Sequence, residues 1–164
     1  MKRWILAVLV LSVLPMAAFA ELGLGGAAFF NSPYLLGQSV DEDDLNVNQF
    51  TFGGDARLKF SILQGEALVL YAAGDVQSLN IYLDAGVAFD ILMLRLSAGA
   101  GPNFIFNIGE HDWLQPGLNA KLSADIKLAR LSIGLSYIMD LNLDSGVDVN
   151  TSSGLLGAQV LLWL

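Results

Sequence analysis

Residues 50–59, with the sequence FTFGGDARLK, decide the fold. Two series of residues interleave here, an apolar one (Phe50, Phe52, Ala56, Leu58) and a polar one (Thr51, Asp55, Arg57, Lys59). Because the side chains of a strand alternate between its two faces, one face is apolar and the other is charged. The second face carries too much charge for a dry core. The pattern therefore favours a barrel that is apolar toward lipid and polar toward its lumen.

The same alternation recurs along the chain and predicts an all-β fold. We expect a closed, antiparallel, eight-stranded transmembrane β-barrel with strands at 22–31, 48–62, 66–73, 79–90, 93–106, 113–127, 130–140 and 154–164. Short turns at 63–65, 91–92 and 128–129 should lie at one end, with longer loops at the other, the asymmetry of bacterial outer-membrane barrels. Pro116 cannot donate to a strand ladder, so a bulge or local irregularity is predicted there.

The first twenty residues resemble an export signal. Lys2 and Arg3 precede an apolar run over residues 4–14, and Ala18-Phe19-Ala20 forms an A-x-A cleavage site. The apolar run is shorter than the roughly 20 residues that a membrane helix needs. We expect a signal peptide over 1–20 and an outer-membrane barrel domain over 21–164. The chain has no cysteine, which fits a barrel closed by its own strand ladder rather than by disulfides.

Charge is segregated along the chain, which is strongly apolar (54% hydrophobic residues) yet has a net charge of -8. Basic residues fall in or beside predicted strands, whereas the predicted loops carry only acids. We predict a charge network in the lumen made of Asp55, Arg57, Lys59, Glu66, Asp84, Arg95, Lys121, Asp125, Lys127 and Arg130. Unpaired charges in a confined interior are costly, so we expect ion pairs such as Glu66 with Arg95 and Asp125 with Arg57.

Neutral residues should line the lumen above this network. The inward positions there are predicted to be Tyr82, Asn80, Gln115, Gly117, Asn119, Gly99 and Gly101. Such small and neutral side chains would leave a pocket open to the outside.

Acidic loop residues form two candidate cation sites. The first is Asp41, Glu42, Asp43 and Asp44, and the second is Asp140, Asn142, Asp144 and Asp148. Consecutive like charges usually extend into water. The second group departs from a calcium loop, because Gly146 is one place late and Thr151 stands where a Glu is needed. We therefore predict no defined metal site and no cofactor, and retain the acidic loops as a surface for an extracellular ligand.

Enzyme chemistry has little support in the sequence. The single histidine, His111, lies in a predicted loop between Glu110 and Asp112, and no strand places a serine beside it to complete a hydrolase triad. There is no phosphate-binding loop and no exposed basic patch. We expect no catalytic residues, no enzyme activity and no nucleic-acid binding.

In architecture the chain resembles the small eight-stranded outer-membrane barrels grouped around OmpA, OmpX and OmpW. The last strand, 154–164, alternates apolar residues toward one face at Leu156, Ala158, Val160, Leu162 and Leu164. It resembles the C-terminal signal recognised by the barrel-assembly machinery, although Leu164 stands where Phe is usual. The resemblance implies the outer membrane of a diderm bacterium, with outer-membrane lipid and the assembly machinery as partners.

Three functional interpretations follow. The first is a structural or surface-interaction barrel with a charged, largely occluded lumen. The alternative is a narrow porin-like channel, or an OmpW-like conduit for small molecules, hydrophobic ones included. A third is a soluble, lipocalin-like exported barrel, which would reverse the faces and fill its core with Phe50, Phe52, Ile81, Leu83 and Leu118.

Overall fold

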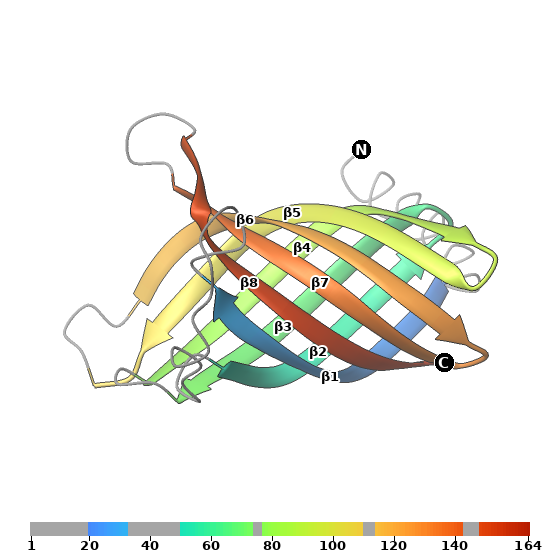
Figure 1. Cartoon of the computed structure of the whole chain (residues 1–164), viewed down its shortest axis with the longest axis horizontal. Coiled ribbons are helices and arrows are strands. Elements are labelled where there is room, and N and C mark those ends of the chain that lie inside the picture. Colours follow the sequence, from blue (N-terminus) through green and yellow to red (C-terminus); the bar gives the residue numbers. More distant parts are fainter. Residues whose placement is uncertain (1–19, 33–49, 74–76, 110–113, 143–147) are drawn as a thin grey trace, which may run out of the picture.

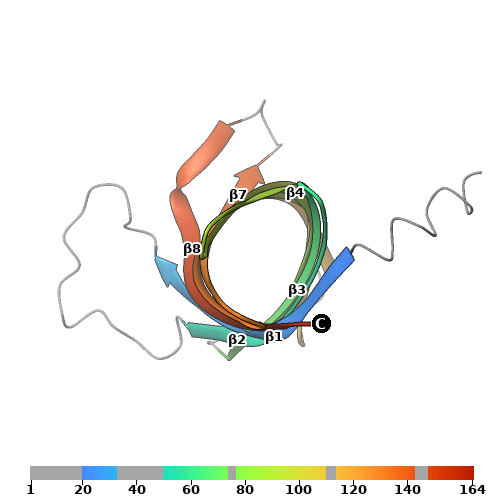
Figure 2. The ribbon, with the colours of Figure 1, turned by 90° about the vertical axis from the view of Figure 1, so that its right-hand side faces the viewer.

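The structure is a computed structural model that describes residues 20–32, 50–73, 77–109, 114–142 and 148–164, without the side chains of 31–32, 142 and 148–153. The described residues form eight strands: β1 (Ala20–Ser32), β2 (Phe50–Phe60), β3 (Leu63–Ala73), β4 (Gln77–Ile91), β5 (Leu94–Asn107), β6 (Leu114–Leu128), β7 (Leu131–Asn142) and β8 (Asp148–Trp163). Each strand pairs antiparallel with the next, and β8 pairs with β1, which closes a barrel (Figures 1 and 2). The predicted fold class is confirmed.

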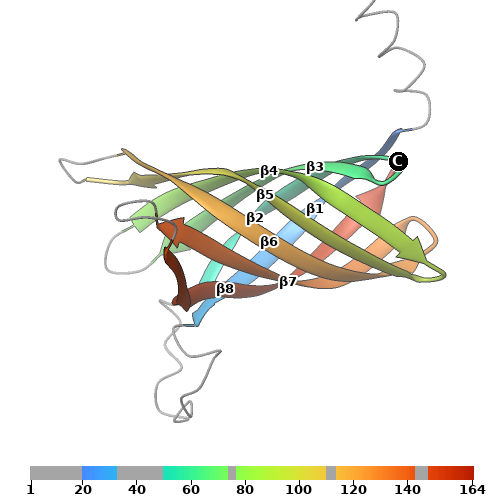
Figure 3. The same ribbon diagram turned by 90° about the horizontal axis from the view of Figure 1, so that it is seen from above.

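Closure removes the free edges that an open sheet would have. The β1–β2 ladder runs from Ala20↔Phe60 to Phe30↔Phe50, and the β1–β8 ladder from Gly23↔Trp163 to Ser32↔Gly154. The strands cross the barrel obliquely (Figure 3), as closure of a small barrel requires. The predicted signal peptide lies outside the described residues except for Ala20, the first residue of β1.

Tight turns join β2 to β3, β4 to β5 and β6 to β7 at one end of the barrel, where β8 also ends (Figure 1). The first residue of each turn has a positive φ, 53° at Ser61, 57° at Leu92 and 58° at Ala129. The predicted turn at 63–65 is wrong, because those residues already belong to β3. The other two turns lie one residue beyond their predicted places. We call this end of the barrel the turn end.

The outer surface of the barrel is apolar. Large exposed hydrophobic side chains occur on every strand, for example Leu24, Phe52, Val69, Phe89, Leu96, Leu122, Leu135 and Val160. Phe52 is 55% exposed whereas Arg57, on the other face of β2, is 0% exposed. The reversed faces that a lipocalin-like core would need are therefore not observed. No helix among the described residues is long and apolar enough to cross a membrane.

The irregularity predicted at Pro116 is wrong. Pro116 pairs with Phe104 in a β5–β6 register that continues unshifted on both sides. The register shift lies instead in the β7–β8 ladder, between Met139 and Leu141. Both of these strands also extend into the predicted 141–153 loop, where Asn142 pairs with Asp148.

Candidate functional site: the charged interior of the barrel

Six ionisable side chains from β2, β3, β4 and β6 form a buried group that we call the middle tier: Asp55, Arg57, Glu66, Asp84, Lys121 and Asp125. All six belong to the predicted lumen network. Arg57 and Asp125 have fully buried side chains, and the side chain of Glu66 is 5% exposed. The alternation of each strand directs these groups inward.

Arg57 lies at the centre of the middle tier. Its Nη2 is 2.8 Å from Oδ2 of Asp55, its Nη1 is 2.9 Å from Oδ2 of Asp125, and its Nε is 3.4 Å from Oε2 of Glu66. Asp55 lies two residues away on the same face, and Glu66 is directly opposite on β3. A planar guanidinium can bind several carboxylates at once because it carries five donors in a fixed geometry. The predicted pair of Arg57 with Asp125 is present.

A chain of hydrogen bonds continues from Asp125. Gln159 Nε2 donates to Asp125 Oδ1 at 2.8 Å, Ser136 Oγ donates to Gln159 Oε1 at 2.7 Å, and the hydroxyls of Ser136 and Ser123 are 2.7 Å apart. On the other side of Arg57, Lys121 donates to Glu66. Gln159 and Ser136 were not among the residues predicted for the network. The alternation of β8 and β7 could have identified them, because both residues occupy inward positions on these strands.

A second charged group, the mouth tier, lies near the turn end and consists of Glu21, Lys59, Asp90, Arg95 and Lys127. Arg95 bridges Asp90 and Glu21, with Nε–Oδ1 and Nη2–Oε2 distances of 2.6 Å each. Lys59 and Lys127 lie 3.3 Å and 3.2 Å from Asp90 Oδ2. Glu21 is an addition to the predicted network.

The ring of Trp163 packs against the guanidinium of Arg95. The Cζ of Arg95 is 4.1 Å from the ring centroid, a cation–π geometry, and the indole Nε1 donates to Ser132 Oγ at 2.9 Å. Gly23, opposite Trp163 on β1, leaves room for this ring. Trp163 is 5% exposed and adds an aromatic cover to the mouth tier.

Two expectations for the charge network are wrong. Glu66 pairs with Arg57 and Lys121 instead of Arg95, because β3 begins at Leu63 and Glu66 is therefore deeper in the barrel than expected. Arg130 lies in the turn between β6 and β7 and is exposed, and it makes no ion pair with the described acids. The remaining network residues all face the interior.

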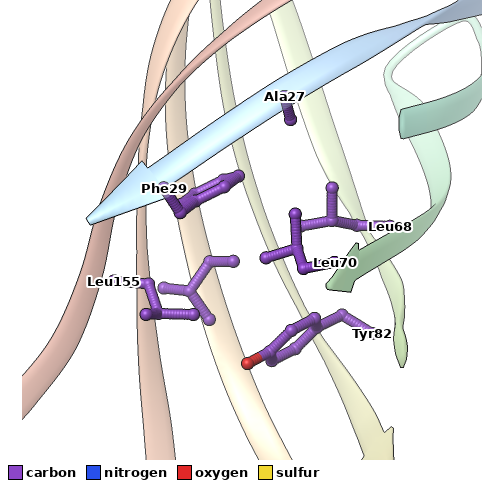
Figure 4. Packing of buried hydrophobic residues seen from close by; sticks show 7 residues of the cluster. Ala27, Phe29, Leu68, Leu70, Tyr82 and Leu155 are labelled. Carbon is purple, nitrogen blue, oxygen red and sulfur yellow. The ribbon is translucent and has the colours of Figure 1, made fainter. Parts of the chain in front are cut away.

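Apolar side chains pack in the lumen on the side of the middle tier that is away from the turn end. This apolar tier consists of Ala27, Phe29, Leu68, Leu70, Tyr82, Ile138 and Leu155, and six of its members are labelled in Figure 4. Phe29, Leu68 and Leu70 are fully buried. A Cβ at Gly157 would overlap the ring of Phe29, so a glycine there makes room for the aromatic side chain. A packed apolar cluster thus occupies part of the lumen where an open pocket was predicted, and Tyr82 belongs to it. Asn119 and Gly99 face the interior as predicted, Asn119 as a donor to Asp84 and Gly99 as part of the wall of a small cavity.

The candidate loop cation sites lie largely outside the described residues. Asp41, Glu42, Asp43, Asp44 and Asp144 lie outside the described residues, as does His111. Asn142 and Asp148 are partners in the β7–β8 ladder, and Asp140 accepts a hydrogen bond from Asn103 Nδ2 at 2.8 Å. Within the described ranges, no group of three His, Cys, Asp or Glu could hold a metal ion.

A closed antiparallel barrel with an apolar outside and an ion-paired inside has the architecture of the small outer-membrane β-barrels. No protein-family model and no curated protein sequence matches this chain. Among solved structures it is similar to the N-terminal β-barrel domain of OprF from Pseudomonas aeruginosa, with a TM-score of 0.57 and 15% identity over 89% of this chain and 98% of that one. Neisserial surface protein A gives a TM-score of 0.49 and 16% identity over 87% of this chain and 96% of that one. The predicted resemblance is confirmed at the level of the fold.

Proposed function

We propose that this chain is an integral outer-membrane protein of a diderm bacterium, with a lumen closed to solutes and a structural or surface-interaction role. The observation that carries the proposal is the succession of three side-chain tiers across the interior: the mouth tier, the middle tier and the apolar tier.

The outer surface supports insertion into a bilayer. Large exposed apolar residues are present on all eight strands, whereas soluble monomers rarely expose contiguous apolar patches of more than a few hundred Å². The described Asp, Glu, Lys and Arg side chains point into the lumen or lie at the turn end. This distribution matches a barrel whose outer face meets lipid.

The contents of the lumen support closure. An eight-stranded barrel is just wide enough for side chains to fill it. In the middle tier one guanidinium holds three carboxylates, and beyond it the fully buried Phe29, Leu68 and Leu70 add an apolar barrier. A solute would have to separate buried ion pairs and then displace packed apolar side chains, and both steps are costly.

With the lumen closed, partners would contact the outer surface and the loops. We assign outer-membrane lipid as the partner of the apolar exterior and the barrel-assembly machinery as the partner of strand 154–164. The outward side chains of that strand include the exposed Leu156, Val160, Leu162 and Leu164. An extracellular ligand would meet the acidic segment 41–44. The protein is expected to be non-enzymatic and to bind no nucleic acid.

Planar-bilayer conductance tests closure. The chain, refolded in detergent and inserted into a bilayer, should be electrically silent. The variant Phe29→Ala/Leu70→Ala, which thins the apolar tier, should show intermittent openings, whereas Phe52→Ala/Leu58→Ala on the outer face should stay silent. Steady conductance of the wild-type chain would contradict closure and favour the narrow channel. A mature chain that stays soluble and monomeric without detergent would contradict membrane insertion.

A further inference from the structure

A small cavity lies inside the barrel beside the middle tier. Its volume is about 10 Å³, and the side chains around it include Gln64, Glu66, Asp84, Ser97, Lys121 and Ser123. A cavity of roughly 10–15 Å³ is the minimum that holds one water molecule, and such a molecule needs two to four polar partners. The cavity therefore has room for one water molecule at most, and its wall carries polar groups that could bind it.

Two acceptor atoms on the cavity wall have no hydrogen-bond donor. Asp84 Oδ1 accepts from Asn119 Nδ2 at 2.8 Å, but Asp84 Oδ2 is buried without a partner, and so is Oε1 of Gln64. The two residues are 7% and 8% exposed. Leaving a buried acceptor unsatisfied costs stability, and a charged one costs more. The wall thus requires a donor that the described side chains do not provide.

The cavity also lies between the two ends of a chain of polar contacts in the interior. That chain runs from Lys121 through Glu66, Arg57, Asp125, Gln159 and Ser136 to Ser123, and each step is a hydrogen bond except the ion pair of Glu66 with Arg57. Lys121 and Ser123 both line the cavity. A group in the cavity that donates to Asp84 Oδ2 and Gln64 Oε1 and accepts from the Lys121 ammonium would join both residues to this chain.

We propose that the cavity is a binding site for a single water molecule, which donates to Asp84 Oδ2 and Gln64 Oε1 and accepts from Lys121 Nζ. The two hydrogens of water match the two unsatisfied acceptors. A small cation would also suit carboxylate and amide oxygens, but the ammonium group of Lys121 on the same wall opposes it. The site deepens the proposed closure, because the water links Asp84 and Gln64 to the network around Arg57.

The substitution Gly99→Ala distinguishes a filled cavity from an empty one. Gly99 lines the cavity, and a Cβ there would lie 3.4 Å from both Asp84 Cβ and the Ala85 carbonyl oxygen, so a methyl group fits. If water occupies the site, the methyl displaces it and leaves Asp84 and Gln64 without a donor, so the urea midpoint of the refolded barrel falls. An empty cavity would instead be filled favourably, and the midpoint would rise.

Gly26→Ala is the matched control, because a Cβ there meets only the Gly53 carbonyl oxygen, at 3.7 Å, on the outer face of β1. A Gly99→Ala midpoint equal to or above that of Gly26→Ala would overturn the proposal. In a Gln64→Leu background one partner of the water is gone, so the fall caused by Gly99→Ala should shrink by at least half.

Two further measurements identify the occupant independently of folding yield. A crystal structure of the wild-type barrel should show one density peak within hydrogen-bonding distance of Asp84 Oδ2 and Gln64 Oε1, and an empty site would overturn the proposal.

The urea midpoint should be equal in sodium chloride and choline chloride at the same ionic strength. A higher midpoint in sodium that disappears in Asp84→Asn would identify a cation instead. A conducting wild-type barrel would refute closure alone, since the midpoints still report on the water.

Discussion

The mouth tier and the middle tier use the same chemistry at different depths. In the mouth tier the side chains of Glu21 and Asp90 are 45% and 29% exposed, whereas those of Arg57 and Asp125 in the middle tier are fully buried. Exposed ion pairs contribute little, because water competes for both partners. Breaking a buried pair is expensive, because it leaves a charge without solvent or partner. Depth, more than the number of pairs, should decide how much each tier contributes.

The two tiers also differ in charge balance. The middle tier contains four carboxylates, Asp55, Glu66, Asp84 and Asp125, but only two cations. The mouth tier has three cations, Lys59, Arg95 and Lys127, and two acids. The buried tier thus has the larger imbalance, and Arg57 supplies most of the compensation there.

Replacement of Arg57 by Ala should cause the largest loss in the free energy of unfolding. It would leave Asp55, Glu66 and Asp125 close together and buried, with a loss of about 3–5 kcal/mol in the free energy of unfolding. Urea unfolding of the barrel refolded in lipid vesicles, followed by tryptophan fluorescence, measures the loss. Arg57→Lys keeps the charge but loses the multidentate geometry, so it should fall between Arg57→Ala and the wild type. A loss below 1 kcal/mol would show that water reaches the middle tier.

Trp163→Leu should have an intermediate effect at the boundary of the mouth tier. It removes the cation–π contact with Arg95 and the hydrogen bond to Ser132, which together contribute about 1–2 kcal/mol to the free energy of unfolding. The same urea series measures it. Because Ser132→Ala loses only the hydrogen bond, it should account for no more than about half of the effect. Equal losses in the two variants would argue against a contribution from the cation–π contact.

Lys127→Ala should cause the smallest loss in the free energy of unfolding, because Lys127 lies in the more exposed mouth tier. The side chain of Lys127 is 23% exposed and lies 3.2 Å from Asp90 Oδ2, a carboxylate that Arg95 also binds. We expect a loss of at most about 1 kcal/mol, because a partly solvated pair contributes little and is screened by salt. The difference from wild type should vanish at high salt. A large loss that salt leaves unchanged would mean that the mouth tier is as dry as the middle tier.

Much of the interior could be predicted from the alternation alone. On β2 the inward positions of Asp55, Arg57 and Lys59 follow from the period of a strand, and so does the pairing of Arg57 with an acid. The pairing of Glu66 could not be predicted, because Gly65, the residue type most typical of a turn, lies within β3, whereas the turn itself is at Ser61-Ile62. Locating the turn too late moved Glu66 away from Arg57, its true neighbour.

The apolar tier was missed for a related reason. Residues 67–73, ALVLYAA, are apolar at every position, so the alternation assigns no face to them. Counting in twos from the inward Glu66 would have placed Leu68 and Leu70 inside, where both are fully buried. Phe29 follows β1 glycines that likewise carry no polar signal. Where both faces of a strand are apolar, only the register with the neighbouring strands distinguishes lumen from lipid.

The sequence by itself determined the strands, the antiparallel barrel and the inward direction of the charged residues, because these depend on local alternation and on where charge is tolerated. The tertiary structure decided which charges meet and what closes the lumen. Those contacts depend on the register between strands that are distant along the chain, such as Arg57 with Asp125 and Arg95 with Glu21. A shift of two residues in one strand keeps every face correct but changes every partner, so pairing is fixed only when the barrel closes.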